Sequence, residues 1–216
     1  MSKNKIGYSF KEEYINTVTH ILGLCVSIFG SFFLIANVVT SYQDWRYIFS
    51  AIVFSMSLIL MYSCSSLYHG VRNDRLKIIF RKFDHCAIYI LIAGSYTPFT
   101  LTSMYLDSGL FLFIFIWILA FFGIIVEFFL SKYSFFISMI LYLVMGWFVL
   151  FFWESLSQTL HNNGLILIIS GGGFYTLGVI FFIWERIPYN HAIWHVFVLA
   201  GSISHYFAVL YCFEIM

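Results

Sequence analysis

The sequence predicts an all-α integral membrane protein, a bundle of seven transmembrane helices. The first observation is composition: 62% of the 216 residues are hydrophobic, 10% are charged, and the mean hydropathy is +0.92. A soluble chain of this length cannot hide so much apolar surface, so its solvent is lipid. The second is that the apolar residues fall into seven runs long enough for helices to cross a bilayer. The third is an uneven distribution of basic residues among the connections.

The first three runs are separated by polar connections. Run 19–40 follows a short N-terminal segment, 1–18, which we expect in the cytosol. Run 46–68 follows after a short turn. The connection 70–83 is longer and mixes basic with apolar residues, so we expect an amphipathic loop on the inner leaflet, in contact with anionic headgroups. Run 85–106 comes next, and it contains a proline that favours a kink.

The remaining four runs follow with short connections, which leaves one transmembrane domain over 19–213. Run 109–130 is separated from its predecessor by two polar residues, and run 135–154 by a short polar turn. Run 164–184 contains three consecutive glycines, which favour close helix packing. Run 191–213 ends near the C-terminus.

Basic residues orient the bundle, since cytoplasmic connections of membrane proteins are rich in Lys and Arg. With the N-terminus in the cytosol, ten of the 11 Lys and Arg residues lie inside and only Arg46 lies outside. The C-terminus is then outside, and the protein is predicted to be a multi-pass protein of the cell inner or plasma membrane. The inner basic residues are Lys3, Lys5, Lys11, Arg72, Arg75, Lys77, Arg81, Lys82, Lys132 and Arg186.

Histidines gather at the inner ends of three runs. His69 closes the second run, Asp84 precedes the third, and His191-x-x-x-His195 opens the last. A His-x-x-x-His pair on a helix places two imidazoles about 40° apart on one face, one turn apart. A third imidazole and a carboxylate from neighbouring helices would complete a zinc site with one open, water-bearing position. The shared depth therefore predicts a metal site near the cytoplasmic face.

Several of these residues have alternative roles. Asp84 suits the N-cap of the third run, and Ser65, one turn before His69, could bond its own i−4 carbonyl. Cys64 and Cys86 lie near the histidines and could offer a sulfur ligand. Two histidines with Asp84 would also suit iron. His20 could be a fourth polar group or an alternative ligand, His161 is expected in an exposed loop, and Glu127 and His205 should face the interior because charge is costly in lipid.

The ordered motifs resemble one known family over nearly the whole chain. They are Glu13-x-x-Asn16-x-x-Thr19-His20, Ser65 with Tyr68-His69, Asp84-His85 with Ala93-Gly94-Ser95-Tyr96-Thr97-Pro98, and His191-x-x-x-His195 with Gly201-Ser202. This set resembles the hemolysin III family, the bacterial branch of the progestin and adipoQ (adiponectin-receptor-like) receptors.

The resemblance implies a seven-helix bundle with an inside N-terminus, opposite to G-protein-coupled receptors. It also implies a zinc held by His69, His191 and His195, with Asp84 and Ser65 contacting the metal-bound water or the ligands. The receptor branch is associated with ceramide hydrolysis, and the name hemolysin III with red-cell lysis.

Three functions fit these expectations. The first is a zinc-dependent hydrolase acting on a lipid amide or ester, with Asp84 and Ser65 as catalytic residues and membrane lipids as partners. The second is a cytolysin-type, membrane-perturbing or pore-forming protein, for which the chain offers few polar residues to line a pore. The third is a membrane sensor or receptor with a structural zinc. The net charge of +1 gives no indication of a nucleic-acid partner.

Overall fold

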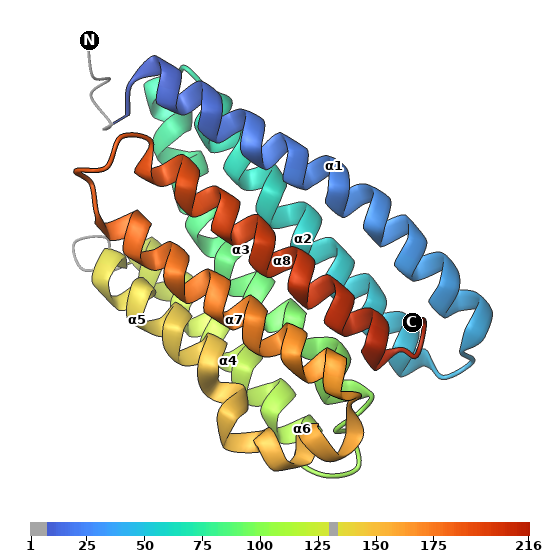
Figure 1. Cartoon of the computed structure of the whole chain (residues 1–216). Helices are drawn as coiled ribbons and strands as arrows, with labels where there is room; N and C mark the ends of the chain where they lie inside the picture. Colours follow the sequence, from blue (N-terminus) through green and yellow to red (C-terminus); the bar gives the residue numbers. More distant parts are fainter. Residues whose placement is uncertain (1–7, 130–133) are drawn as a thin grey trace.

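The computed structural model describes residues 8–129 and 134–216, and all regular structure within them is helical. The helices pack side by side as a bundle, with the start of α1 and the start of α8 at the same end (Figure 1). Residues Lys3, Lys5 and Lys132, which we predicted to be inside, lie outside the described part. The elements are α1 (Phe10–Ser41), α2 (Trp45–Gly70), α3 (Asp74–Leu101), α4 (Gly109–Phe129), α5 (Ser134–Trp147), the 3-10 helix η1 (Phe148–Phe152), α6 (Trp153–Thr159), α7 (Asn162–Ile183) and α8 (Asn190–Cys212).

Six helical segments of the described residues are long and apolar enough to cross a membrane. They are α1, α2, α4, the segment Phe135–Thr159, α7 and α8. The seventh predicted span, α3, is not among them, because polar and small residues continue into its second half. Its second half is almost wholly buried and packs against both α2 and α4. A helix enclosed by protein need not be apolar on every side.

α1 begins nine residues before the predicted run, so much of the expected N-terminal segment is helical. Ser9 is the N-cap: its side chain accepts a hydrogen bond from the backbone N–H of Glu12, and the Glu12 side chain accepts one from the Ser9 N–H. This capping box satisfies amides that a helix start leaves unpaired. The first turns of α1 are polar, so the helix start could not be recognised from apolar runs alone.

The predicted loop 70–83 is also wrong, since α3 starts at Asp74. The Asn73 side chain caps the helix by accepting from the backbone N–H groups of Arg75 and Leu76. One turn later Lys77 is 4% exposed, and its ammonium lies 2.8 Å from Oε1 of Glu13 in α1. The segment therefore packs into the bundle by pairing one of its charges, rather than lying wholly on the membrane surface.

The predicted run 135–154 is broken where α5 changes into η1 and α6. The hydroxyl of Tyr96, in α3, donates to the carbonyl of Met145 at 2.7 Å and accepts from the N–H of Val149 at 2.9 Å. In an α-helix these two backbone groups would bond to each other. The tyrosine thus inserts into the hydrogen-bond ladder, which is a recognised cause of helix distortion.

Small residues bring α2 and α3 close together. A Cβ added at Gly94 would lie 2.3 Å from the hydroxyl of Ser57 in α2, closer than real side chains approach. The Ala93-Gly94-Ser95 patch therefore acts in packing, as small residues do at membrane-helix interfaces. This close approach fixes the position of α2, whose last turn carries His69.

Candidate metal centre

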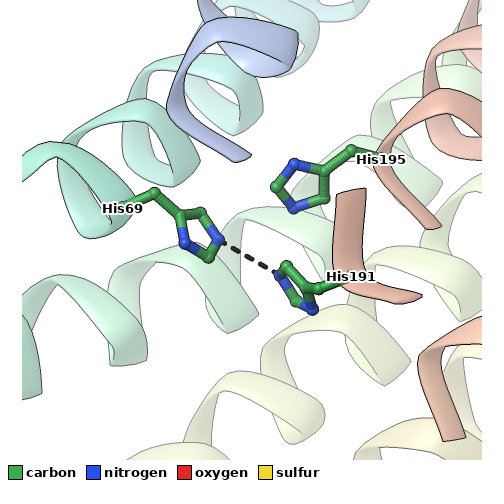
Figure 2. Close-up of side chains that lie close together, drawn as sticks. All are labelled: His69, His191 and His195. Atoms are coloured by element: carbon green, nitrogen blue, oxygen red, sulfur yellow. Dashed lines mark hydrogen bonds between the residues drawn. The ribbon is translucent and has the colours of Figure 1, made fainter. Parts of the chain in front are cut away.

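Three histidines from two helices converge at one end of the bundle. His69 comes from the last turn of α2, and His191 and His195 come from the first turns of α8 (Figure 2). All three side chains are buried, and one nitrogen of each lies within 4.8 Å of the others. The Nε2 atoms of His69 and His191 are 3.1 Å apart. The predicted convergence of these three imidazoles is confirmed.

The start of α8 is held in place by its neighbour. Tyr189 immediately precedes the helix in a left-handed conformation, with φ of 58°, which is uncommon for a residue other than glycine. Asn190 is buried, and its side-chain amide donates to the carbonyl of Phe181 in α7 at 3.0 Å. Backbone conformations of this kind persist where the surrounding contacts enforce them. The turn therefore aims His191 and His195, one helical turn apart, at α2.

The cluster fits a tetrahedral metal. At a Zn–N distance near 2.05 Å, two ligand nitrogens of a tetrahedral zinc lie about 3.3 Å apart. The 3.1 Å separation of the His69 and His191 Nε2 atoms is close to this value, and one ring nitrogen of His195 lies within 4.8 Å of both rings' ligand atoms. Without a metal the two Nε2 atoms can share one proton in a hydrogen bond, and a cation bound between them would take the place of that proton.

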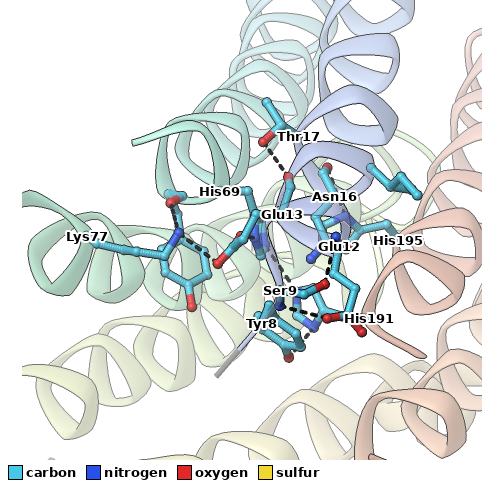
Figure 3. A network of polar contacts seen from close by, with 12 residues as sticks. Tyr8, Ser9, Glu12, Glu13, Asn16, Thr17, His69, Lys77, His191 and His195 are labelled. Carbon is cyan, nitrogen blue, oxygen red and sulfur yellow. Dashed lines mark hydrogen bonds and ion pairs between the residues drawn. The ribbon is translucent and has the colours of Figure 1, made fainter. Parts of the chain in front are cut away.

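A buried carboxylate fixes the orientation of His69. Oε2 of Glu13 lies 2.6 Å from Nδ1 of His69, and Oε1 lies 2.8 Å from the ammonium of Lys77 (Figure 3). An ionised carboxylate can only accept, so Nδ1 carries the proton and Nε2 keeps a free lone pair. A carboxylate behind a ligating histidine is the usual arrangement in zinc proteins. Lys77 offsets the negative charge that Glu13 brings into the bundle.

His195 is oriented by the backbone of α1. Its Nδ1 lies 3.2 Å from the carbonyl oxygen of Asn16 and 3.1 Å from the hydroxyl of Thr19. A carbonyl accepts only, so Nδ1 of His195 is again the donor and Nε2 is available to a metal. The same tautomer is thus selected at His69 and at His195 by two different acceptors.

Tyr8 reaches His191 from just before α1. Its hydroxyl lies 3.0 Å from Nδ1 of His191, and its ring packs against the imidazole with 4.9 Å between centroids. Burial raises the pKa of Tyr8 above its usual value, and the nearby charge of Glu13 adds to this effect. The hydroxyl therefore stays protonated and can either donate or accept. A metal on Nε2 of His191 would require the proton on Nδ1, and the Tyr8 oxygen can accept that proton's hydrogen bond.

One short segment, residues 8–19, thus holds Nδ1 of all three histidines. Tyr8 and Glu13 were not assigned to the site from the sequence, although Glu13 stands in the motif behind the resemblance. Two signals could have found them. Ser9-x-x-Glu12 is a capping-box pattern that places the helix start early. With the helix extended, Glu13, Asn16 and His20 fall on one face.

Asp84 and Ser65 lie together, but neither belongs to the three-histidine group. Asp84 is buried within α3, and Ser65 of α2 lies close to its carboxylate. Because α3 begins at Asp74, Asp84 is not the helix N-cap expected from the sequence. Among the described residues, the group of ligand atoms able to share a metal contains neither Asp84 nor Cys64 nor Cys86.

Other expected polar residues have separate roles. His20 is buried and stacks on His195 with 3.5 Å between ring centroids, without joining the metal-ligating group. Glu127 faces the interior as predicted and pairs with Nδ1 of His85 at 3.0 Å. His161 is exposed, also as predicted, and caps the start of α7.

Comparison with known proteins agrees with this architecture. The family described as "Haemolysin-III related" matches residues 8–206. The "Hemolysin-3 homolog" of Bacillus subtilis (strain 168) is 40% identical over 96% of this chain and 98% of its own length. The "Hemolysin-3" of Bacillus cereus is 38% identical over 93% and 91%. The human "Monocyte to macrophage differentiation factor" is 32% identical over 92% and 83%. The chain is a multi-pass membrane protein that belongs to the haemolysin-III-related family.

Proposed function

We propose that the protein is a zinc-dependent hydrolase of the membrane, acting on a lipid amide or ester. The observation that carries this proposal is the convergence of three buried imidazoles whose Nδ1 atoms are all engaged, with the Nε2 atoms of His69 and His191 3.1 Å apart. His69, His191 and His195 would hold the ion. When bound by three neutral ligands, zinc acts as a Lewis acid and lowers the pKa of water towards neutrality.

Asp84 and Ser65 would carry out the proton transfer of the reaction. Asp84 is a buried carboxylate on α3, the helix next to α2, and its partner Ser65 lies one turn before His69. A carboxylate in this setting can accept a proton from a water, and the serine hydroxyl can hold it in orientation. The Asp84–Ser65 pair therefore supplies the general base that three imidazoles, occupied by a metal, cannot supply.

The surroundings favour a lipid substrate. Large apolar side chains cover the outside of the bundle, as at Phe29, Phe32 and Phe121. The histidines lie near helix ends, at the depth where a lipid's polar linkage meets its hydrocarbon. We place the N-terminus and the histidine cluster on the cytoplasmic side, because ten of 11 basic residues then lie inside.

The names of two relatives support a second candidate, membrane lysis. Both Bacillus relatives are named for hemolysis. In that case the histidine cluster would be a structural metal site tying α2 to α8, and lysis would not require hydrolysis.

Metal analysis joined to a lipid turnover assay separates these candidates. The purified chain in nanodiscs should contain one zinc, and should release fatty acid from a panel of labelled lipid amides and esters. A chelator should remove both the metal and the turnover. A zinc-loaded chain that hydrolyses none of the panel, or a chelated chain that works equally well, would contradict the hydrolase.

A further inference from the structure

The helix α3 is longer than the hydrocarbon of a membrane is thick. Its 28 residues extend over about 42 Å, whereas the hydrocarbon core of a bilayer measures about 30 Å. The charged end is the start, because residues 93–101 contain no charged side chain. About twenty residues cross the core, so a span that ends at Leu101 begins near Lys82. The turns from Asp74 to Arg81 then lie at the depth of the lipid headgroups.

Basic side chains dominate the surface of these first turns. Four of them reach the surface between residues 72 and 83, all of which the structure describes: Arg72, Arg75, Arg81 and Lys82. One exposed acidic residue, Asp74, opposes them, and the buried Lys77 is already paired with Glu13. The surface therefore keeps an excess of positive charge, which attracts anionic headgroups.

Basic and apolar side chains occupy adjoining parts of this surface. Arg75 and Lys82 are seven residues apart, which is about two turns, so they lie on one face of α3. Ile79 lies between them along the helix, and Phe83 lies one turn after Ile79; these two side chains are 48% and 45% exposed. In a helix at a membrane interface, such apolar side chains contact acyl chains while the basic ones reach the headgroups.

The end of α4 adds a second wall. Phe128 is the last but one residue of α4 and is 41% exposed. Its ring contacts that of Phe83 edge to face, with 6.3 Å between centroids. The ammonium of Lys82 lies 5.5 Å from the centroid of the same Phe128 ring. An aromatic ring attracts a cation at this distance and takes up none of its N–H donors in a conventional hydrogen bond. The lysine is thus held in place with donors left for an anion.

The acidic residues nearby leave the charge of Lys82 uncompensated. Glu127 stands in the last turn of α4, but it is 3% exposed and its carboxylate pairs with Nδ1 of His85 at 3.0 Å. Asp84 is buried as well. Within the described part of the chain, Lys82 forms no ion pair. Its charge is available to an anion from outside the protein.

These features together form a phosphate site with apolar walls. We propose that the α3–α4 site, formed by Arg75, Lys82, Phe83 and Phe128, binds the headgroup phosphate of an anionic phospholipid, whose acyl chain lies against the two phenylalanines. Arginine and lysine are the side chains that bind phosphate in proteins. A zwitterionic headgroup would bring an ammonium, for which this surface offers little acidic charge.

The lipid bound at the α3–α4 site is a partner of the protein and not its substrate. The histidines come from α2 and α8, whereas α4 packs against α3 and α5. The site therefore lies on another side of the bundle from the metal centre. The inference goes beyond the proposed hydrolase and does not depend on it.

Lipid retention by the purified full chain tests the proposal. Native mass spectrometry in a nonionic detergent counts bound dioleoyl phosphatidylglycerol and dioleoyl phosphatidylcholine during titration. The parent chain should bind the anionic lipid severalfold more tightly. Lys82→Gln and Arg75→Gln should each weaken this binding severalfold and leave phosphatidylcholine unaffected, whereas Lys82→Arg should bind like the parent. Lys11→Gln removes one exposed charge at the same end of the bundle and should have no effect.

Two further measurements separate the site from general attraction between charges. Phe128→Ala removes the ring next to Lys82 and should also weaken binding of phosphatidylglycerol. Inorganic phosphate should not displace the lipid, because it has no acyl chain for the phenylalanines to contact. Helical content, measured on each variant by circular dichroism, shows that the fold is kept.

Three outcomes would overturn the proposal. The first is equal affinity of the parent chain for the two lipids. The second is an equal loss of affinity in Lys82→Gln and Lys11→Gln, which would show that total charge alone attracts the lipid. The third is displacement of phosphatidylglycerol by inorganic phosphate, which would show a site for the free ion.

Discussion

Glu13 and His69 make the shortest of the contacts to the three histidines: Oε2 of Glu13 lies 2.6 Å from Nδ1 of His69. Glu13 lies near the start of α1 and His69 near the end of α2, 56 positions apart in the chain. The contact fixes the proton on Nδ1 and so leaves the Nε2 lone pair free for the metal that we propose. Because the same carboxylate pairs with Lys77, it also joins α3 to the site.

Glu13→Gln should weaken zinc binding about 10–100-fold, the usual effect of removing the carboxylate behind a ligating histidine. The amide keeps the shape but has less negative charge to hold the Nδ1 proton. Competition with a chromophoric chelator measures the affinity. Glu154→Gln, at an exposed carboxylate of α6, is the matched control and should bind zinc like the parent chain. Equal affinities for the two variants would remove Glu13 from the site.

Lys77→Met should destabilise the folded chain by about 3–5 kcal/mol, because it leaves the Glu13 carboxylate buried and partly uncompensated. The double change Glu13→Gln with Lys77→Met removes both charges. It should cost less than the sum of the single changes, since neither variant group is ionised. Unfolding in detergent under metal-free conditions measures all three. Strict additivity would show that the pair is not coupled.

His69→Ala, or the joint change of His191 and His195 to Ala, should abolish zinc binding. His161→Ala should not, because His161 is an exposed helix cap. Metal loss should also lower thermal stability, since free zinc at about a hundred times its Kd stabilises the native state by about 2.7 kcal/mol. Metal analysis and thermal unfolding of the purified variants measure both effects. Full zinc occupancy in the double variant would refute the site.

Asp84→Asn should leave zinc content and folding unchanged and lower turnover about 10²–10⁴-fold, the contribution expected of a general base. Asparagine keeps the shape and can still bond to Ser65, but it cannot take up a proton. Fatty-acid release from labelled lipids, with zinc measured on the same samples, provides the readout. Parent-like turnover in Asp84→Asn would assign the base elsewhere.

Cysteines introduced at Asn73 and Asn162, in a background without the four native cysteines, should lie on opposite sides of the membrane. The distribution of basic residues puts Asn73 in the cytosol. Labelling of intact cells with an impermeant maleimide should therefore modify position 162 only. Modification of both positions, or of position 73 alone, would contradict the proposed orientation.

The sequence predicted the helices that apolar composition defines, and it failed where a residue from another helix decides the structure. The charged first turns of α3 were predicted to be a loop, because the hydropathy of a segment does not show that Lys77 forms an ion pair with Glu13 of another helix. The break after α5 depends on Tyr96, a residue 49 positions away from its backbone acceptor. Neither partner is visible within the local segment.

The histidine cluster was predictable for a different reason. Depth in the membrane follows from the position of a residue along its helix, so His69, His191 and His195 could be placed at one level without knowing how the helices pack. The residues that contact the outer nitrogens of these histidines could not be predicted in this way. Whether Tyr8 and Glu13 face the histidines depends on how α1 is rotated about its own axis, which only the packed bundle defines.

The histidine cluster and its partners join the start of α1 to α8, and this has a consequence for biosynthesis. Chains emerge from the ribosome N-terminus first, so Tyr8, Glu13 and His69 reach the membrane long before His191 and His195. Until α8 inserts, one imidazole faces an incomplete site, and the ion cannot be held by three ligands. Under the proposed function, metal uptake would therefore be the closing event of assembly, and chains that end before α8 would be unable to retain the ion.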